Sequence, residues 1–269
     1  MVGETIAGVS WLGFLAGLIV FGRGMWRGVK TQQLLGIGIA FYALTMKAYT
    51  RLGVSGVREP LTTEERVWAA MFTVAAGTAM LSLLLIIMRG QQEPSPTHRR
   101  RLVGLFLTAI SSAVLLRVVT WIPGPELAPS NDFLNDYGGD LRVVIYELIF
   151  AAWLGLPLGA LGLFVYRFQR GTTRWVTFAG CVLGVGWAGW KVVGTAVRYI
   201  SGDPIPLESP VSVATGWASL TLLTCGLLSG QISGALRRAR ETREYTLARR
   251  ADDERHSTPT PDTTDSSAA

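Results

Sequence analysis

The sequence predicts an all-α membrane protein: a bundle of seven transmembrane helices, with the N-terminus outside and the C-terminus in the cytoplasm. Seven apolar stretches recur along the chain, each near the roughly 20 residues that a helix needs to cross a hydrocarbon core of about 30 Å. Only 16% of the residues are charged, against about 25% in typical soluble domains. Arg and Lys gather in every second gap between the stretches, and this asymmetry predicts the orientation.

Each apolar stretch is expected to be a helix, because a backbone in lipid must satisfy its own hydrogen bonds. The predicted spans are 5–22, 33–51, 63–88, 102–121, 141–166, 174–200 and 210–234. Together they form one transmembrane domain over residues 1–234. The first span is expected to be retained, since Glu4 stands where a signal peptide carries Lys or Arg.

Basic residues distinguish the two sides of the predicted bundle. Seventeen of the 25 Lys and Arg residues follow the first, third, fifth or seventh span. They are Arg23, Arg27, Lys30, Arg89, Arg99, Arg100, Arg101, Arg167, Arg170, Arg174, Arg237, Arg238, Arg240, Arg243, Arg249, Arg250 and Arg255. Cytoplasmic loops carry such an excess, so we predict that these segments are cytoplasmic. This sidedness explains the basic charge without a nucleic-acid partner, and the Arg-rich composition suggests the cytoplasmic membrane of a bacterium.

Local signals mark where several helices begin. Thr62 and Glu65 form a predicted capping box before the third span. Asp140 is placed to cap the fifth span. Ser209 precedes a proline at the first position of the seventh span. Pro157 lies in the middle of the fifth span and should kink it.

Two segments outside the spans carry distinctive charge. The loop 122–140 holds four acidic residues, which a hard cation could bind, but it lacks EF-hand spacing, and we expect a solvated surface loop without metal. Residues 235–255 should form a basic cytoplasmic helix that contacts anionic headgroups. Residues 256–269 are rich in Ser, Thr, Pro and Asp and should be disordered, either as a solubilising end or as a segment that recruits a cytoplasmic protein.

Paired glycines suggest close helix packing. Four pairs with GxxxG spacing are Gly13 and Gly17, Gly155 and Gly159, Gly180 and Gly184, and Gly226 and Gly230. Such pairs allow helix backbones to approach each other closely. Because they lie on four helices, packing within the bundle is favoured over homodimerisation.

The two ends of the transmembrane domain share a weak internal repeat. The matching pairs are Trp11 and Trp153, Arg27 and Arg170, and Lys47 and Lys191, at offsets of 142, 143 and 144 residues. Near-constant offsets favour two parallel three-helix units joined by the fourth span, although such common membrane residues also match by coincidence. This 3+1+3 arrangement resembles that of the PQ-loop and SWEET-type transporters, but the Pro-Gln pair of those proteins is missing here.

Four ionisable residues inside the spans form the candidate binding site. Lys47, Arg117, Glu147 and Lys191 lie on four different spans, at broadly similar depth in the outer leaflet. Buried ionisable groups usually face the bundle interior or a wet cavity. Together these residues would make a net positive pocket for an anion or an anionic lipid. The alternative interpretation is that each side chain snorkels to the outer interface.

Missing motifs narrow the class of protein. The only histidines, His98 and His256, lie outside the spans, so neither a bis-histidine haem site nor a Ser/His/Asp set can form within them. The chain has no phosphate-binding loop, no zinc pattern, and no lysine in the last span to hold retinal. We therefore predict no catalytic residue, no cofactor and no metal, and a protein that is not an enzyme.

Three interpretations of function remain. The first is transport: a carrier for a small anionic or amphiphilic solute that binds at Lys47, Arg117, Glu147 and Lys191. The second is a membrane sensor or scaffold that recruits a cytoplasmic partner through its C-terminal tail. The third is a structural component that interacts with lipid. A wet cavity at the four charged residues would favour the first interpretation, whereas a tightly packed bundle would favour the second.

Overall fold

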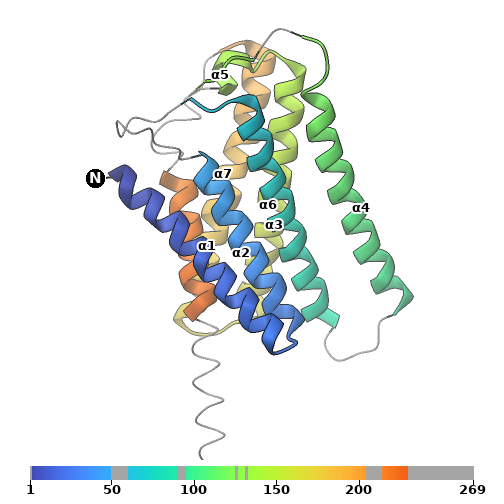
Figure 1. Cartoon of the computed structure of the whole chain (residues 1–269), viewed down its shortest axis with the longest axis vertical. Helices are drawn as coiled ribbons and strands as arrows, with labels where there is room; N and C mark the ends of the chain where they lie inside the picture. Colours follow the sequence, from blue (N-terminus) through green and yellow to red (C-terminus); the bar gives the residue numbers. More distant parts are fainter. Residues whose placement is uncertain are drawn as a thin grey trace, which may run out of the picture. The chain divides into compact units, whose positions relative to one another are not determined.

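The computed structural model describes residues 2–49, 60–89, 95–124, 127–130, 133–203 and 214–229, and it confirms an all-helical fold for these residues (Figure 1). The helices are α1 (Val2–Trp26), α2 (Lys30–Tyr49), α3 (Thr63–Arg89), α4 (Pro96–Val119), α5 (Phe133–Tyr137), α6 (Leu141–Phe168) and α7 (Thr172–Ser201). A further apolar helix covers Ala214–Ser229. The chain divides into two compact units, Met1–Gly226 and Leu227–Ala269. The site and its surroundings lie in the first unit.

Four of the helices, α3, α4, α6 and α7, are long and apolar enough to cross a membrane. Two shorter apolar helices cover Ser10–Trp26 and Ala214–Ser229. Large apolar side chains remain exposed along the bundle, among them Ile19, Leu156 and Leu163. Extensive exposed apolar surface is unusual on a protein in water. The helices therefore fit a membrane protein, while the count of seven spans and their orientation remain predictions.

Hydrogen bonds bring one end of α3, α4, α6 and α7 together around α5. At this end, Thr63 Oγ1 at the start of α3 donates to the Leu127 carbonyl at 3.1 Å. Arg142 Nη1, at the start of α6, donates to the Ile122 carbonyl just after α4 at 3.1 Å. Arg198 Nη2 near the end of α7 donates to the Asn135 carbonyl in α5 at 2.6 Å. The opposite ends of α3, α4, α6 and α7 carry the basic clusters predicted to face the cytoplasm.

Two predicted helix caps are confirmed. The Thr62 backbone N–H donates to Glu65 Oε2 at 3.0 Å, and the Glu65 backbone N–H donates to Thr62 Oγ1 at 3.2 Å, which completes the capping box. The Asp140 carboxylate accepts from the backbone N–H of Arg142 at 2.8 Å at the start of α6. The cap predicted at Ser209 lies outside the described residues.

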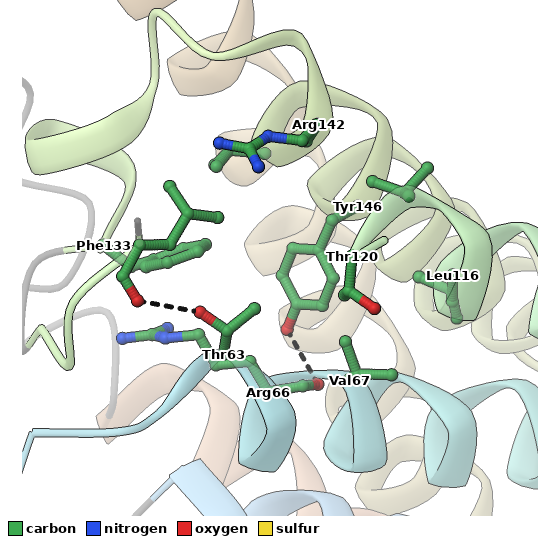
Figure 2. A pocket seen from close by; sticks show the side chains of 11 residues that line it. Thr63, Arg66, Val67, Leu116, Thr120, Phe133, Arg142 and Tyr146 are labelled. Atoms are coloured by element: carbon green, nitrogen blue, oxygen red, sulfur yellow. Dashed lines mark hydrogen bonds between the residues drawn. The ribbon is translucent and has the colours of Figure 1, made fainter. Parts of the chain in front are cut away.

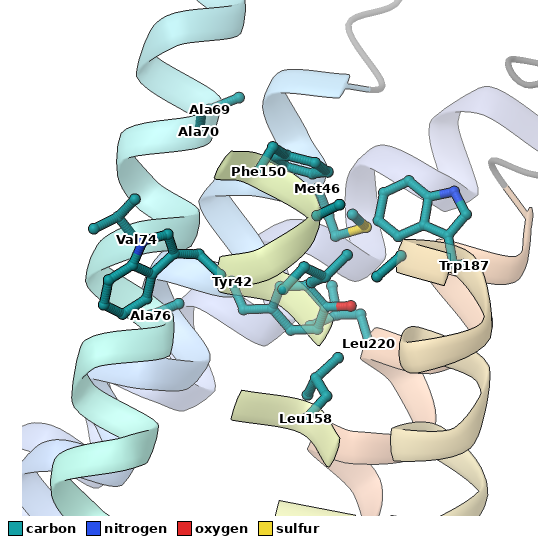
Figure 3. Packing of buried hydrophobic residues seen from close by; sticks show 14 of the residues in the cluster. Tyr42, Met46, Ala69, Ala70, Val74, Ala76, Phe150, Leu158, Trp187 and Leu220 are labelled. Atoms are coloured by element: carbon teal, nitrogen blue, oxygen red, sulfur yellow. The ribbon is translucent and has the colours of Figure 1, made fainter. Parts of the chain in front are cut away.

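The core lies where α2, α3, α6, α7 and the last helix meet. Helix α3 packs against α2, α4 and α6, and α7 packs against α6. The central buried side chains are Tyr42, Met46, Val74, Phe150, Leu158, Trp187 and Leu220 (Figure 3). The last helix joins this core through Ser219 Oγ, which donates to the Gly180 carbonyl of α7 at 2.8 Å.

The loop 122–140 differs from the solvated loop that we predicted. Within it, α5 buries Phe133 and Leu134, which are 2% and 0% exposed. Ser130 is also buried, and its backbone pairs with that of Leu61 in an isolated antiparallel bridge. The prediction of a wholly solvated loop is therefore wrong, because these two adjacent apolar residues form a helical turn that covers the end of the bundle.

Candidate functional site

A buried ion pair joins two of the four predicted site residues. Lys191 Nζ on α7 donates to Glu147 Oε2 on α6 at 3.1 Å. The two side chains are 4% and 0% exposed. Snorkelling to the surface is therefore the wrong interpretation for these two residues, since the carboxylate on the neighbouring helix holds the ammonium group inside the bundle.

Two aromatic side chains lie beside the lysine of this pair. Lys191 Nζ lies 5.6 Å from the centre of the Phe150 ring and 5.9 Å from the ring of Trp187. Glu147 Oε1 is buried and accepts no hydrogen bond from the described residues. Removing one partner of such a pair leaves an uncompensated buried charge, whereas replacing both partners with apolar residues is often tolerated. Loss of either Lys191 or Glu147 alone should therefore destabilise the fold more than loss of both.

Lys47 and Arg117 have other neighbours. Lys47 Nζ lies over the ring of Trp11, 3.5 Å from its centre, at the last turn of α2. Arg117 Nη1 lies 3.7 Å from Glu64 Oε1, and both side chains are substantially exposed. The structure thus brings Lys191 and Glu147 into direct contact, while Lys47 contacts Trp11 and Arg117 contacts Glu64.

Seven of the eight paired glycines face another helix of the same chain. Gly13 faces Ala43, Gly17 faces Gly36 and Ala40, Gly155 faces Ala188, Gly159 faces Val185, Gly180 faces Leu223, Gly184 faces Leu158 and Ser219, and Gly226 faces Thr177. Gly230 lies outside the described residues. The tightest approach among those that involve backbone is at Gly17, where an added Cβ would lie 2.6 Å from the Ala40 nitrogen. Homodimerisation through any of these glycine pairs remains a hypothesis.

A cavity opens between α3, α4 and α6 below α5 (Figure 2). Its volume is about 310 Å³ only when the open space outside its mouth is counted, and most of its lining side chains are buried. The lining residues are Thr63, Arg66, Val67, Leu116, Val119, Thr120, Leu127, Phe133, Arg142, Val143 and Tyr146. None of the four predicted site residues is among them, so the cavity differs from the wet pocket predicted at those charges.

Arg66 is a buried cation that was not predicted from the sequence. Its side chain is 1% exposed, it lies 4.4 Å from the centre of the Phe133 ring, and its Nη2 donates to the Ser130 carbonyl at 2.7 Å. It stands beside Glu64 and Glu65 in the first turn of α3, where charged residues are usually exposed. The available signal was helical spacing, because Arg66 shares a face with Ala70 and Thr73, which are buried.

A row of aromatic rings connects the cavity with the ion pair. Ring centres are 6.2 Å apart for Phe133 and Tyr146, 6.5 Å for Tyr146 and Phe150, and 6.0 Å for Phe150 and Trp187. Tyr146 belongs to the cavity wall, whereas Phe150 and Trp187 lie near Lys191. The row therefore runs from the wall of the cavity to the buried pair of charges.

Comparisons with known proteins do not identify a family for this chain. No protein-family model, no curated protein and no solved structure matches the chain. The ion pair, the cavity and the apolar helices are therefore the features that bear on function.

Proposed function

We propose that the protein is a membrane carrier for a small anionic solute, and that Lys191 is the cation that binds the solute. The observation that carries this proposal is the Lys191–Glu147 pair, which is shielded from solvent between two apolar helices. Ionisable residues inside a membrane domain are costly and commonly mark a solute or ion pathway. In this proposal, Glu147 neutralises Lys191 until the carboxylate or phosphate of a solute replaces it.

Helix α6 has a feature that would allow such an exchange. Pro157 lies inside α6 and has no N–H, so the Trp153 carbonyl lacks its usual donor within the helix. Helix α3 comes close at this carbonyl, where a Cβ added to Gly77 would lie 2.7 Å from the oxygen. A proline in a membrane helix is a common bending point. Movement there would change the position of Glu147 relative to Lys191.

Uptake into proteoliposomes tests the proposal. The full chain would be assayed with a panel of radiolabelled small carboxylates and phosphate, as wild type, as Lys191→Gln/Glu147→Gln and as Lys47→Gln. The double variant keeps two polar side chains of similar shape and removes both charges. We expect uptake of at least one anion by the wild type and by Lys47→Gln, and none by the double variant. Equal uptake by the double variant would show that the pair has only a structural role.

Dense packing around the pair favours a second candidate, a membrane scaffold or sensor. Phe150, Trp187 and the pair itself are all buried, and this arrangement fits a bundle with no solute pathway. The candidate predicts that no anion is taken up and that deletion of residues 235–269 abolishes recruitment of a cytoplasmic partner. Pull-down of cytoplasmic proteins with the full chain and the truncated chain would separate it from the carrier.

A further inference from the structure

We propose that Glu147 takes up one proton each time a solute binds at Lys191, so that the carrier moves a singly charged anion together with a proton. This inference rests on the proposed function and deepens it, since it names the coupling ion and limits the solute to monovalent anions. Two observations carry it: the burial of the Lys191–Glu147 pair, and the unequal surroundings of its two charges.

The charge of the buried pair limits what can replace it. One ammonium group and one carboxylate sum to zero, and both side chains are almost completely buried. A net charge inside a protein is far more costly than a compensated pair. When an anion takes the place of Glu147 at Lys191, the displaced carboxylate adds a second negative charge to the buried region. One proton on Glu147 returns the sum to zero for a singly charged anion, whereas a dianion would leave a charge uncompensated.

The two members of the pair have unequal surroundings. Lys191 Nζ lies 5.6 Å from the centre of the Phe150 ring and 5.9 Å from that of the Trp187 ring, and both rings are buried (Figure 3). The face of an aromatic ring attracts a cation and repels an anion. These rings therefore stabilise the ammonium group when Glu147 leaves, but they do not stabilise a carboxylate. Glu147, rather than Lys191, is consequently the group that changes its charge.

Two hydroxyl groups that come close to the pair along the chain donate elsewhere. The Tyr146 hydroxyl donates to the Arg66 carbonyl at 3.1 Å, and the Thr195 hydroxyl donates to the Lys191 carbonyl at 2.7 Å. Glu147 Oε1 is buried and accepts no hydrogen bond from the described residues, even while Oε2 accepts from Lys191. A carboxylate that leaves Lys191 would therefore lose its donor inside the bundle. A buried acid in this position becomes neutral by binding a proton.

Other charged groups on the helices packed against α6 have partners of their own. Arg66 of α3 and Arg198 of α7 donate to backbone carbonyls, and Arg117 of α4 lies 3.7 Å from Glu64. Arginine stays protonated in proteins, so none of these arginines can carry the coupled proton. Among the residues that the structure describes, Glu147 is the only buried acidic residue. The proton is therefore assigned to its carboxylate.

A transport cycle follows from this charge balance. On the side where the anion enters, water supplies the proton, and an O–H bond forms on Glu147 as its carboxylate leaves Lys191. The anion then pairs with the ammonium group of Lys191. On the opposite side the anion leaves, the O–H bond breaks, the proton passes to water, and the carboxylate pairs with Lys191 again. Because the site is neutral both empty and loaded, each cycle moves no net charge across the membrane.

Uptake under imposed gradients tests the proton coupling. The full wild-type chain would be reconstituted in proteoliposomes, with valinomycin and potassium setting the membrane potential, and uptake by protein-free liposomes would be subtracted. Radiolabelled lactate, pyruvate and phosphate at acidic external pH serve as singly charged probes, and sulfate serves as the dianion. One pH unit and about 59 mV of membrane potential each correspond to a roughly tenfold concentration ratio of a singly charged ion.

The proposal fixes how each gradient acts. With the lumen one pH unit more alkaline, at least one singly charged probe should accumulate about tenfold, and a change of about 59 mV in potential should leave that ratio unchanged. Accumulation that follows the potential and ignores the pH gradient would overturn the proton coupling while the carrier proposal stands. Accumulation of sulfate with the pH gradient would overturn the limit to singly charged anions. No uptake of any probe would overturn both proposals.

Two matched glutamate variants test the assignment to Glu147. Glu147→Gln keeps the shape of the side chain but cannot take up a proton. Its loaded site is neutral, whereas its empty site holds an unpaired ammonium group, so exchange of internal for external anion should persist while pH-driven accumulation falls to the level of protein-free liposomes. Glu64→Gln removes an exposed carboxylate of α3 and should accumulate the anion like wild type. Wild-type accumulation by Glu147→Gln would overturn the assignment.

A direct proton measurement covers the case in which Glu147→Gln does not fold. Pyranine trapped in the proteoliposomes reports the pH of the lumen while the wild type takes up lactate, pyruvate or phosphate from a medium of equal pH. The lumen should acidify by about one proton for each anion that enters, in excess of protein-free liposomes, at any membrane potential. Anion uptake without acidification would overturn the proposal and leave a carrier that is not coupled to protons.

Discussion

The hairpins α1–α2 and α6–α7 contain similar residues, but their lysines differ in burial and in the residue that they contact. In the first, the backbones approach closely at Gly17, and Lys47 stays partly exposed over the ring of Trp11. In the second, the approach at Gly159 is looser, and Lys191 is buried against Glu147. The environment of a lysine in these helices therefore depends on the residue that the neighbouring helix presents to it, as well as on its own position.

Breaking the ion pair should have the largest effect on stability. Glu147→Leu should lower the free energy of unfolding by about 3–5 kcal/mol, because Lys191 would remain buried without its carboxylate partner. The double variant Glu147→Leu/Lys191→Met should be near wild type, since replacing both charges with apolar groups is often neutral or stabilising. Chemical unfolding in detergent micelles measures both variants. A double variant as unstable as Glu147→Leu would contradict the assignment of the cost to an unpaired charge.

Glycine substitutions should have opposite signs in the two hairpins. Gly17→Ala places a Cβ 2.6 Å from the Ala40 nitrogen and should destabilise by about 1–3 kcal/mol, because the backbones must separate. Gly159→Ala meets only Val185 Cγ2 at 3.8 Å and should stabilise by about 0.5–1 kcal/mol, the usual gain in a helix interior. The same unfolding assay compares them. Equal effects would mean that both helix pairs relax alike and that the contrast in packing has no energetic meaning.

Local features of this fold could be predicted from the sequence. The apolar stretches predict helices, and the caps at Thr62 and Asp140 depend only on residues two or three positions away. Lys191 and Glu147 stand out in the sequence because charged residues are rare in apolar membrane helices. The helix class and these caps therefore follow from neighbouring residues.

Features that depend on distant residues could not be predicted in the same way. The partner of Lys191 lies 44 positions earlier in the chain, so nothing near the lysine distinguishes burial from snorkelling. Arg66 is buried by the Ser130 carbonyl, 64 positions away, and by the ring of Phe133. The cavity likewise requires the end of α4 to meet α3 and α6. Such contacts become visible only when the helices are packed.

The cap of α6 should contribute a smaller, pH-dependent part of the stability. Asp140→Ala should cost about 0.5–2 kcal/mol through loss of the N-cap. The Arg142 side chain, by hydrogen bonding to Asp140, holds the pKa of that carboxyl below its usual value. The ionised Asp140 carboxylate therefore adds to the free energy of unfolding above its unfolded-state pKa. This contribution is lost as pH falls through the lower folded-state pKa. Melting curves of Asp140→Asn, which keeps a capping oxygen, should lack this acid-dependent part; an unchanged pH profile would assign it to another group.

The smallest effect is expected at Lys47, which makes it the sharpest comparison with Lys191. Lys47→Gln removes a cation that lies 3.5 Å from the centre of the Trp11 ring, and an exposed cation–π contact is worth about 0.5–1 kcal/mol. Lys191→Gln leaves Glu147 buried and uncompensated, so it should cost several-fold more. Unfolding of the two variants side by side measures the difference. Equal losses would mean that the two lysines are energetically equivalent, which would strengthen the predicted repeat and remove the contrast between the hairpins.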